Sequence, residues 1–425
     1  MRSNRFVRLA VALLAPLLVA GVVVAQAGAA FADGGHHGRV LYVSPSAKHW
    51  NSDRSCRSAA FKTIQSAVNA APAGGTVVVC PGTYYEQVVI SKPLTLTGKQ
   101  ATIDEKGVTP TFQVMLPPPT GTQTIYAAVV MTSSGIDFTG FRVQHAQGEG
   151  ILAAGLSGTV NGIVIAGNTV VYNDLGGPTA PTYFECLGSG AVPNDCGEGV
   201  HFAGGVAYST IRGNFIAHNS GGVLLSDDVG PTHNNVVQGN VVTDNLSDCG
   251  ITVPGHNPMA VNAAGVPQPS VAGVYRNAIL DNAVTGNGVV GEGGAGVLFA
   301  NAAPGTASYD NLVQGNYIAG NGLSGVTMHA HGPASNEDLN GNVIVRNFIG
   351  KNNVLGDPLD GAPGTAVTKP TGVLVFSGGT PVSVTIAHNH IFNNFFGIWL
   401  SKPVTAFGLK TNTFSHVVKH ISAGH

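Results

Sequence analysis

One short template recurs seven times, and it constrains the fold of this chain more than any other feature. It reads as an apolar residue, two residues, Asn, one residue, an apolar residue, two residues and Asn. The first Asn of each copy is Asn168, Asn214, Asn240, Asn282, Asn316, Asn347 or Asn389, and the second is Asn173, Asn219, Asn245, Asn287, Asn321, Asn352 or Asn394. The first Asn residues are 26 to 46 positions apart, which predicts one structural unit per copy with insertions in the loops.

Each copy is followed by a second apolar run that reads Gly, Val or Ile, any residue, and an apolar residue. These runs begin at Gly199, Gly222, Gly250, Gly296, Gly325, Gly372 and Gly397. Alternation of period two predicts strands, and coils about 4.8 Å apart would place equivalent residues directly over one another. A stacked Asn amide donates to one neighbour and accepts from the other, so we interpret the Asn residues as structural. We therefore predict an all-β, single-stranded, right-handed parallel β-helix with an internal asparagine ladder.

The composition supports this prediction. Gly accounts for 59 of 425 residues, and charged residues make up 10% of the chain, where about 25% is typical. Such a chain suits a regular stack of strands and turns. The net charge of −2 and the absence of any run of Lys or Arg exclude a nucleic-acid partner.

The segment before the repeats predicts a cap for the open end of the stack. Residues 61–70 (FKTIQSAVNA) read as a short amphipathic helix with Ile64 and Val68 on one face, followed by the strand GGTVVV and the turn PGTYYEQV. These motifs resemble the pectin lyase-like family of β-helix proteins, which includes NosD-type members with PbH1 repeats. The resemblance covers residues 60–402 and implies the fold with its N-terminal capping helix. It implies no single activity, because the fold carries lyases, hydrolases, esterases, epimerases and non-enzymatic modules.

The N-terminus predicts export. Basic residues at Arg2, Arg5 and Arg8 precede an apolar stretch over residues 9–25, which is typical of a secretory signal peptide, with an uncleaved membrane anchor as the alternative. We expect the following divisions: signal peptide 1–32, N-terminal extension 33–59, capped β-helix 60–402 and C-terminal tail or cap 403–425. The mature protein is then secreted, and we expect it to be a monomer with no membrane span.

Five cysteines in an exported chain allow two disulfides and leave one thiol. We predict that Cys56 pairs with Cys80 and that Cys186 pairs with Cys196, which closes a short loop rich in Gly and Pro. Cys249 is then free, and we expect it to be buried, since a free Cys behaves as a small hydrophobic residue.

Catalytic motifs of the family are largely missing. Polygalacturonases of this fold carry paired Asp before a strand, a Gly-His-Gly and an Arg-x-Lys, whereas here Asp227 and Asp228 follow the strand, His256 lies in Gly-His-Asn, and no Arg-x-Lys occurs. After residue 100 the arginines are few, which disfavours a strongly anionic glycan held by charge-assisted bonds. They are Arg142, Arg212, Arg276 and Arg346.

Alignment of the seven Gly-Val strands nevertheless predicts one polar cluster. Just past the strands, successive coils present six candidates: Asp227, Asp228, His256, Asn301, His329 and His331. Asp228 and His256 would lie about 5 Å apart, one coil rise. A carboxylate beside an imidazole can act as an acid/base pair or hold a divalent cation, Ca²⁺ included, and His233 could join from the same loop. The alternative is an incidental gathering of polar residues in loops.

The outward position of the same strands predicts an apolar row made of His201, Leu224, Thr252, Leu298, Thr327, Leu374 and Trp399. Such a row requires a cover, either the chain's own long loops, which we favour, or a ligand. Sugar rings stack on aromatic faces, so Trp399 is a candidate for substrate binding, together with His201 and Asn301.

Three acidic residues precede their strands on nearby coils, namely Glu198, Asp248 and Glu292. They could serve hydrolysis or bind Ca²⁺, but we favour solvated turns, because their offsets from the Gly differ. Two functions remain open. The first is a secreted protein that binds or cleaves an extracellular or cell-surface polysaccharide, as a lyase or hydrolase, in a groove along the strands. The second is a non-catalytic NosD-like or surface-adhesion module that binds a partner.

Overall fold

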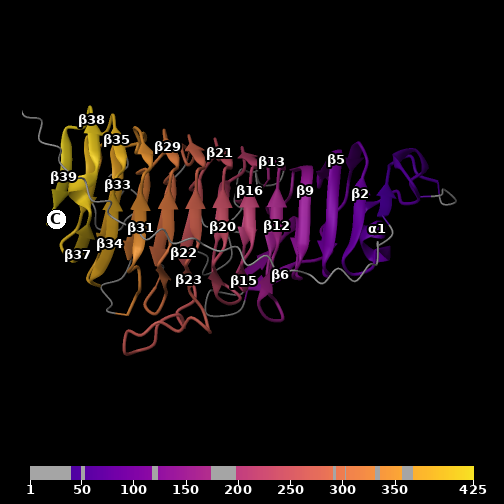
Figure 1. Cartoon of the computed structure of the whole chain (residues 1–425), viewed down its shortest axis with the longest axis horizontal. Helices are drawn as coiled ribbons and strands as arrows, with labels where there is room; N and C mark the ends of the chain where they lie inside the picture. Colours follow the sequence, from indigo (N-terminus) through magenta and orange to yellow (C-terminus); the bar gives the residue numbers. More distant parts are fainter. Residues whose placement is uncertain are drawn as a thin grey trace, which may run out of the picture. The chain divides into compact units, whose positions relative to one another are not determined.

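The computed structural model describes residues 40–48, 53–116, 123–173, 198–290, 293–301, 303–330, 336–356 and 367–425. These residues belong to one compact unit, Gly38–His425. They form a right-handed parallel β-helix, which confirms the predicted fold. Figure 1 shows strands of successive coils side by side in chain order.

Three parallel sheets build the coils. The first sheet contains β1 (Val40–Val43), β2 (Gly75–Val79), β3 (Gly82–Tyr84), β5 (Leu94–Asp104), β9 (Ile136–Gln144), β12 (Val164–Ala166), β13 (Thr169–Val171), β16 (Thr210–Arg212), β17 (Phe215–Ala217), β20 (Val236–Gln238), β21 (Val241–Thr243), β24 (Ala278–Leu280), β25 (Ala283–Thr285), β28 (Leu312–Gln314), β29 (Tyr317–Ala319), β31 (Asn342–Val345), β32 (Phe348–Ile349), β34 (Val382–Ala387), β35 (His390–Phe392), β37 (Val404–Phe407) and β38 (Thr413–Ser415).

The second sheet contains β4 (Val88–Ile90), β8 (Ala127–Met131), β10 (Glu149–Ala153), β14 (Glu198–Phe202), β18 (Gly221–Leu225), β22 (Ile251–Gly255), β26 (Val297–Asn301), β30 (Val326–Ala330), β33 (Thr371–Ser377), β36 (Phe396–Leu400) and β39 (Lys419–Ala423). The small third sheet contains β11 (Val160–Asn161), β15 (Val206–Ala207), β19 (Thr232–His233), β23 (Val274–Tyr275) and β27 (Ser308–Tyr309). An antiparallel hairpin joins β6 (Val114–Leu116) to β7 (Gln123–Ile125).

Equivalent residues of the template stack in register. Ile165 pairs with Ile211, Ile211 with Val237, and Val237 with Ile279. All four side chains are buried in one apolar core that runs through the coils. Burial of a branched aliphatic side chain in such a core stabilises the fold by about 1.5–3 kcal/mol, so the repeats hold the stack together.

The asparagine ladders are confirmed as structural. Asn240 illustrates the pattern: its Nδ2 donates to Asn282 Oδ1 at 3.0 Å and to the carbonyl of Ile211 at 3.0 Å. Its Oδ1 accepts from the backbone N–H and the side-chain amide of Asn214, both at 2.9 Å. The ladder therefore satisfies backbone groups in each turn as well as its own amides.

A third ladder was not predicted. It runs through Asn235, Asn277, Asn311 and Asn342, each bonded to the next. Every member lies five residues before the first Asn of its template, so the spacing carried the signal. The sequence analysis did not predict this ladder because other copies of the template have Ile163, Ser209 or Val384 at that position.

A short helix covers the N-terminal end of the core, as predicted, although α1 begins at Ile64 and not at residue 61 (α1, Ile64–Ala70). Ile64 and Val68 are buried against the core. The Thr63 side chain caps the helix, and the Glu86 carboxylate accepts from the N–H groups of Ile64 and Gln65 at 2.7 and 2.8 Å. These bonds satisfy amides that a helix N-terminus leaves without intrahelical partners.

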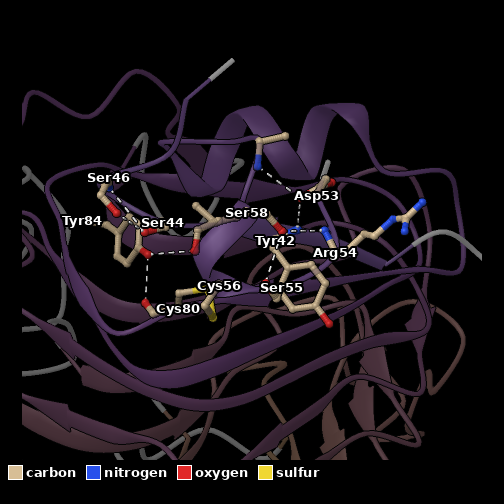
Figure 2. The surroundings of a disulfide bond; sticks show 12 residues. Tyr42, Ser44, Ser46, Asp53, Arg54, Ser55, Cys56, Ser58, Cys80 and Tyr84 are labelled. Carbon is tan, nitrogen blue, oxygen red and sulfur yellow. Dashed lines mark hydrogen bonds between the residues drawn. A yellow bond between two sulfur atoms is a disulfide. The ribbon is translucent and has the colours of Figure 1, made fainter. Parts of the chain in front are cut away.

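The predicted bridge between Cys56 and Cys80 is present and ties the segment before α1 to the end of β2 (Figure 2). Beside it, the Tyr84 hydroxyl donates to the carbonyl of Cys80 at 2.9 Å. Asp53 accepts from the backbone N–H of Tyr42 at 2.8 Å. Cys249 is free and buried, as expected. Cys186 and Cys196 lie outside the described residues.

Strands extend to both ends of the described chain. β1 pairs with β2, and β37, β38 and β39 pair with β34, β35 and β36, so the last residues add a further coil. The predicted signal peptide lies outside the described residues. No helix in the described ranges is long and apolar enough to cross a membrane.

Candidate functional site

The outward row of the second sheet stacks as the sequence predicts. His201 pairs with Leu224 and Leu224 with Thr252, and the register continues to Leu374 and Trp399. The chain covers much of this row itself. The β6–β7 hairpin packs Val114 and Ile125 against Leu152, while Val367 packs against Leu374 and Trp399.

The predicted contact between an acidic residue and an imidazole is present beside this row. Asp228, which follows β18, lies 2.9 Å from His256 Nδ1 through its Oδ1, and His256 follows the next strand of the sheet, β22. Asp227 points instead to the backbone of the loop. It accepts from the N–H groups of His256, Asn257 and Gly273 at 2.7, 3.1 and 2.7 Å. Asp227 therefore fixes the loop after β22.

His201 extends this contact into a continuous network. Its Nδ1 lies 2.9 Å from Glu149 Oε1, and its Nε2 lies 2.9 Å from Ser226 Oγ. The Ser226 hydroxyl donates in turn to Asp228 Oδ2. Glu149, His201, Ser226, Asp228 and His256 are thus linked in one chain of hydrogen bonds.

Glu149 was missed by the sequence analysis. A signal was available, because Glu-Gly-Ile-Leu at residues 149–152 has the same pattern as Glu-Gly-Val-His at residues 198–201. The chain before Glu149 carries no Asn template, and the alignment of strands included only those that follow one. The structure pairs Ile151 with Val200, which places Glu149 beside Glu198 at the starts of β10 and β14.

The contacts of Asp228 with two histidines and Ser226 set the two Asp side chains apart in acidity. Burial raises the pKa of Asp227 to about 6, although the N–H groups of His256 and Asn257 and the charge of His256 favour its ionised form. Burial also tends to raise the pKa of Asp228, but the charge and hydrogen bond of His256, the charge of His201 and the bond from Ser226 outweigh it. The pKa of Asp228 therefore lies below its usual value, so Asp228 is ionised at neutral pH.

The network lies beneath the surface, whereas the sequence analysis expected the site in a groove along the strands. Asp227 is 0% exposed and Asp228 3% exposed, and the His256 side chain is 11% exposed. These residues do not line a groove, because the loop after β22 folds back and its amides bind Asp227. A catalytic role for these residues stays a prediction.

The other predicted members occupy related positions. Asn301 and His329 are buried on β26 and β30, where His329 pairs with Ala300. His331 lies outside the described residues. His233 does not extend the network but stacks on Tyr275 with ring centroids 4.8 Å apart, because it belongs to the third sheet.

Two of the three acidic residues ahead of the strands are buried. Glu198 is 1% exposed and Asp248 is 5% exposed, so the interpretation as solvated turns is wrong for both. Gly221 lies between them, and a Cβ there would come within 3.0 Å of Glu198 Oε1. A glycine at this position leaves room for the carboxylate. Glu292 lies outside the described residues.

Trp399 lies in the wall of an open pocket of about 590 Å³ near the C-terminal end of the stack. The pocket is lined by Val367, Phe376, Ser377, Gly378, Phe396, Trp399, Ser401, Lys402, Pro403 and His425. The rings of Trp399 and His425 stack with centroids 4.9 Å apart. The aromatic rings of Phe376, Phe396 and Trp399 lie near the hydroxyl groups of two serines and the ammonium group of Lys402. This combination suits a polar ligand with apolar faces.

A row of exposed apolar side chains crosses the first sheet. Phe215 pairs with Val241, and the same register continues through Ala283 to Tyr317 and Phe348. The exposed fractions of Phe215, Val241, Tyr317 and Phe348 are 41%, 40%, 47% and 55%. Exposed apolar side chains in one continuous row are typical of a contact surface.

Two family models match long segments of the chain. Residues 50–261 match the model of a family described as "Protein of unknown function (DUF1565)", and residues 190–357 match "Periplasmic copper-binding protein (NosD)". No curated protein matches the chain.

Similar solved structures include the A-module of a mannuronan C-5 epimerase from Azotobacter vinelandii, at 16% identity and a TM-score of 0.49, covering 84% of this chain and 92% of that one. An alginate lyase from Paenibacillus sp. shares 13% identity at a TM-score of 0.42, covering 84% and 96%. An endopolygalacturonase from Stereum purpureum shares 16% identity at a TM-score of 0.38, covering 83% and 89%. At these identities the likeness concerns the fold alone.

Proposed function

We propose that this right-handed parallel β-helix protein, segments of which match the NosD and DUF1565 families, binds a neutral or weakly charged glycan in the pocket around Trp399. The protein works outside the cytoplasm. The Cys56–Cys80 disulfide supports this location, because such bonds persist in oxidising compartments.

The observation that carries the proposal is the open aromatic pocket. Phe376 and Phe396 are partly buried and offer faces against which the C–H groups of a sugar ring can pack, while Trp399 is 7% exposed and forms the wall behind them, stacked on His425. Ser401 and Lys402 can bind sugar hydroxyl groups beside these rings. The volume of about 590 Å³ falls in the range of small-molecule sites, roughly 300–1,000 Å³.

The charges around the pocket favour a neutral ligand. Lys402 is the one cationic side chain among its described lining residues. A polyanionic glycan is usually held by several Arg side chains through paired hydrogen bonds. A single ammonium group suits a glycan with few charges.

The proposal favours binding over cleavage. The predicted catalytic residues Asp227, Asp228 and His329 are buried, whereas an acid or base must come within hydrogen-bonding distance of the bond it cleaves. The predicted catalytic residues within the described ranges do not line the Trp399 pocket. A lyase or hydrolase activity therefore stays the alternative within the glycan proposal.

A glycan panel tests both possibilities on the purified mature protein. Binding is measured by isothermal titration and cleavage by the release of reducing or unsaturated ends. We expect binding to at least one neutral glycan, weakened roughly tenfold or more by Trp399→Ala, because the pocket loses the ring against which Val367 and His425 pack. Phe348→Ala is the matched control. It removes an exposed aromatic ring from β32 of the first sheet, outside the pocket, and the variant should bind like the parent.

Other outcomes would redirect the proposal. Binding that survives Trp399→Ala but not Phe348→Ala would move the site to the first sheet. Cleavage that His256→Ala abolishes would assign catalysis to the buried network. No binding to any glycan would reject the proposal.

The exposed apolar row of the first sheet favours a second candidate, a non-catalytic module that binds a protein partner. Flat rows of aromatic and aliphatic residues are common at protein interfaces. This function predicts that Tyr317→Ser and Phe348→Ser weaken association of the protein with isolated cell envelopes. Trp399→Ala would leave that association unchanged, whereas loss of association only in Trp399→Ala would reject this candidate.

A further inference from the structure

Three buried side chains on two neighbouring strands point their polar atoms at one another. Glu149 begins β10, while Glu198 and His201 belong to β14. One ligand atom from each lies within 4.8 Å of the other two, and all three residues are buried. Carboxylate oxygens and an imidazole nitrogen are common metal ligands.

A second observation indicates that a ligand belongs among them. Glu149 is 0% exposed, and its Oε2 has no hydrogen-bond partner among the described residues. A buried carboxylate oxygen without a partner is costly, since water no longer solvates it. In a metal site the same atom would be a ligand.

The surroundings of these three side chains are rich in buried carboxylates. Asp228 is buried beside them, with its Oδ2 3.8 Å from His201 Nε2. A divalent cation bound by Glu149, Glu198 and His201 would offset the cost of burying these carboxylates together.

We propose that Glu149, Glu198 and His201 bind a divalent transition-metal ion of the Zn²⁺ type. The Nδ1 of His201, which lies 2.9 Å from Glu149 Oε1, is the nitrogen that faces the carboxylates. The Nε2 then keeps its proton and donates to Ser226 Oγ, and Ser226 donates to Asp228. Such an outer partner fixes the tautomer and orientation of a metal-binding histidine.

The donor set favours this class of ion over Ca²⁺. Ca²⁺ prefers six to eight oxygen ligands, whereas this site offers an imidazole nitrogen and two carboxylates. Zn²⁺ takes such mixed ligands at about 2.0–2.2 Å, which places neighbouring ligand atoms roughly 3.4 Å apart. Small movements of side chains already this close would form the site.

The site is separate from the proposed glycan pocket, because the two share no residue. It joins consecutive strands of the second sheet at the starts of β10 and β14. A metal bound there would link two coils and stabilise the stack, so its role is structural and independent of glycan binding.

The test measures metal in the purified full-length chain. After a chelator removes weakly held ions, we expect one Zn²⁺ per chain by mass spectrometry of the metal. The thermal unfolding midpoint should fall when a strong chelator removes this ion under destabilising conditions. Glu149→Gln should lower Zn²⁺ affinity by at least roughly tenfold, as loss of a ligand does elsewhere.

Glu105→Gln is the matched control. Glu105 is also buried, at 1% exposure, but it bonds to the N–H of Gln147 outside the three-residue set. It should bind Zn²⁺ like the parent. This control separates the site from adventitious binding by histidines elsewhere in the chain.

Each outcome decides the proposal. Equal Zn²⁺ binding by the parent and Glu149→Gln, or no stoichiometric Zn²⁺ in the parent, overturns it and leaves the hydrogen bond to His201 as the contact of Glu149. Binding of Ca²⁺ in preference to Zn²⁺ overturns the assignment of the ion. If Glu149→Gln does not fold, X-ray absorption of the parent with Zn²⁺ must show one imidazole and carboxylate oxygens, and several imidazoles would overturn the proposal.

Discussion

Replacement of Asn240 by Leu tests how the coils are held together. Leu has nearly the shape of Asn, so the change removes the polar atoms while it largely keeps the volume. Asn240 is 1% exposed. Its Nδ2 loses the bonds to Asn282 and to the carbonyl of Ile211, and its Oδ1 loses both bonds from Asn214.

The backbone N–H of Asn214 determines most of the cost. Its partner in the ladder is the Oδ1 of Asn240, so the substitution leaves this amide buried and unpaired. An unpaired buried donor costs about 1–3 kcal/mol, and each further lost bond costs about 1 kcal/mol. The apolar character of Leu offsets part of this sum. We therefore expect the free energy of unfolding to fall by about 3 kcal/mol.

Urea denaturation followed by circular dichroism measures this change. Asn161→Leu is the matched control, because Asn161 is exposed on β11, and it should unfold close to the parent. Equal midpoints for Asn240→Leu and the parent would refute the view that the ladder stabilises the stack. A loss as large in the control would show that added Leu itself is the cause.

Three further predictions follow from the disulfide, the free thiol and a buried acid. Peptide mapping without reduction should recover the peptides of Cys56 and Cys80 joined, and free thiols at both positions would contradict the pairing. Because the two residues are 24 positions apart, Cys56→Ser should lower the free energy of unfolding by about 3 kcal/mol. Burial and then the charge of Asp248 raise the pKa of the Cys249 thiol, so thiol reagents should modify it only in urea, and rapid labelling of the native protein would contradict its burial. Burial raises the pKa of Glu105 to about 7, so the folded state takes up this proton first as the pH falls. As the pH rises from about 4.5 to about 7, the free energy of unfolding should therefore decline by roughly 3 kcal/mol. Glu105→Gln should remove this part of the pH dependence of the urea midpoint.

The repeating parts of the fold could be predicted because one physical requirement recurs in every coil. Ile211 and Val237 must face the core, and Asn214 and Asn240 must satisfy the turns, so the same residue types return at fixed offsets. Because these offsets are fixed, the register of neighbouring strands could be predicted. The register in turn predicted the contact between Asp228 and His256.

Burial of the site could not be predicted, because it depends on how the loops close. Nothing in the sequence near Asp227 indicates that its carboxylate binds three backbone amides. The role of Glu149 depends on pairing with a strand 49 residues away in sequence, Ile151 with Val200. The Trp399 pocket likewise needs Val367 and His425, which lie in different segments.

Fluorescence of Trp399 gives the most direct test of the proposed glycan site. The chain has two tryptophans, Trp50 and Trp399, so a Trp50→Phe variant reports on the pocket alone. If a glycan packs in this pocket, its titration should change the emission of Trp399 saturably, with the same dissociation constant as calorimetry. A glycan that binds by calorimetry while the emission of Trp399 stays constant would contradict the account.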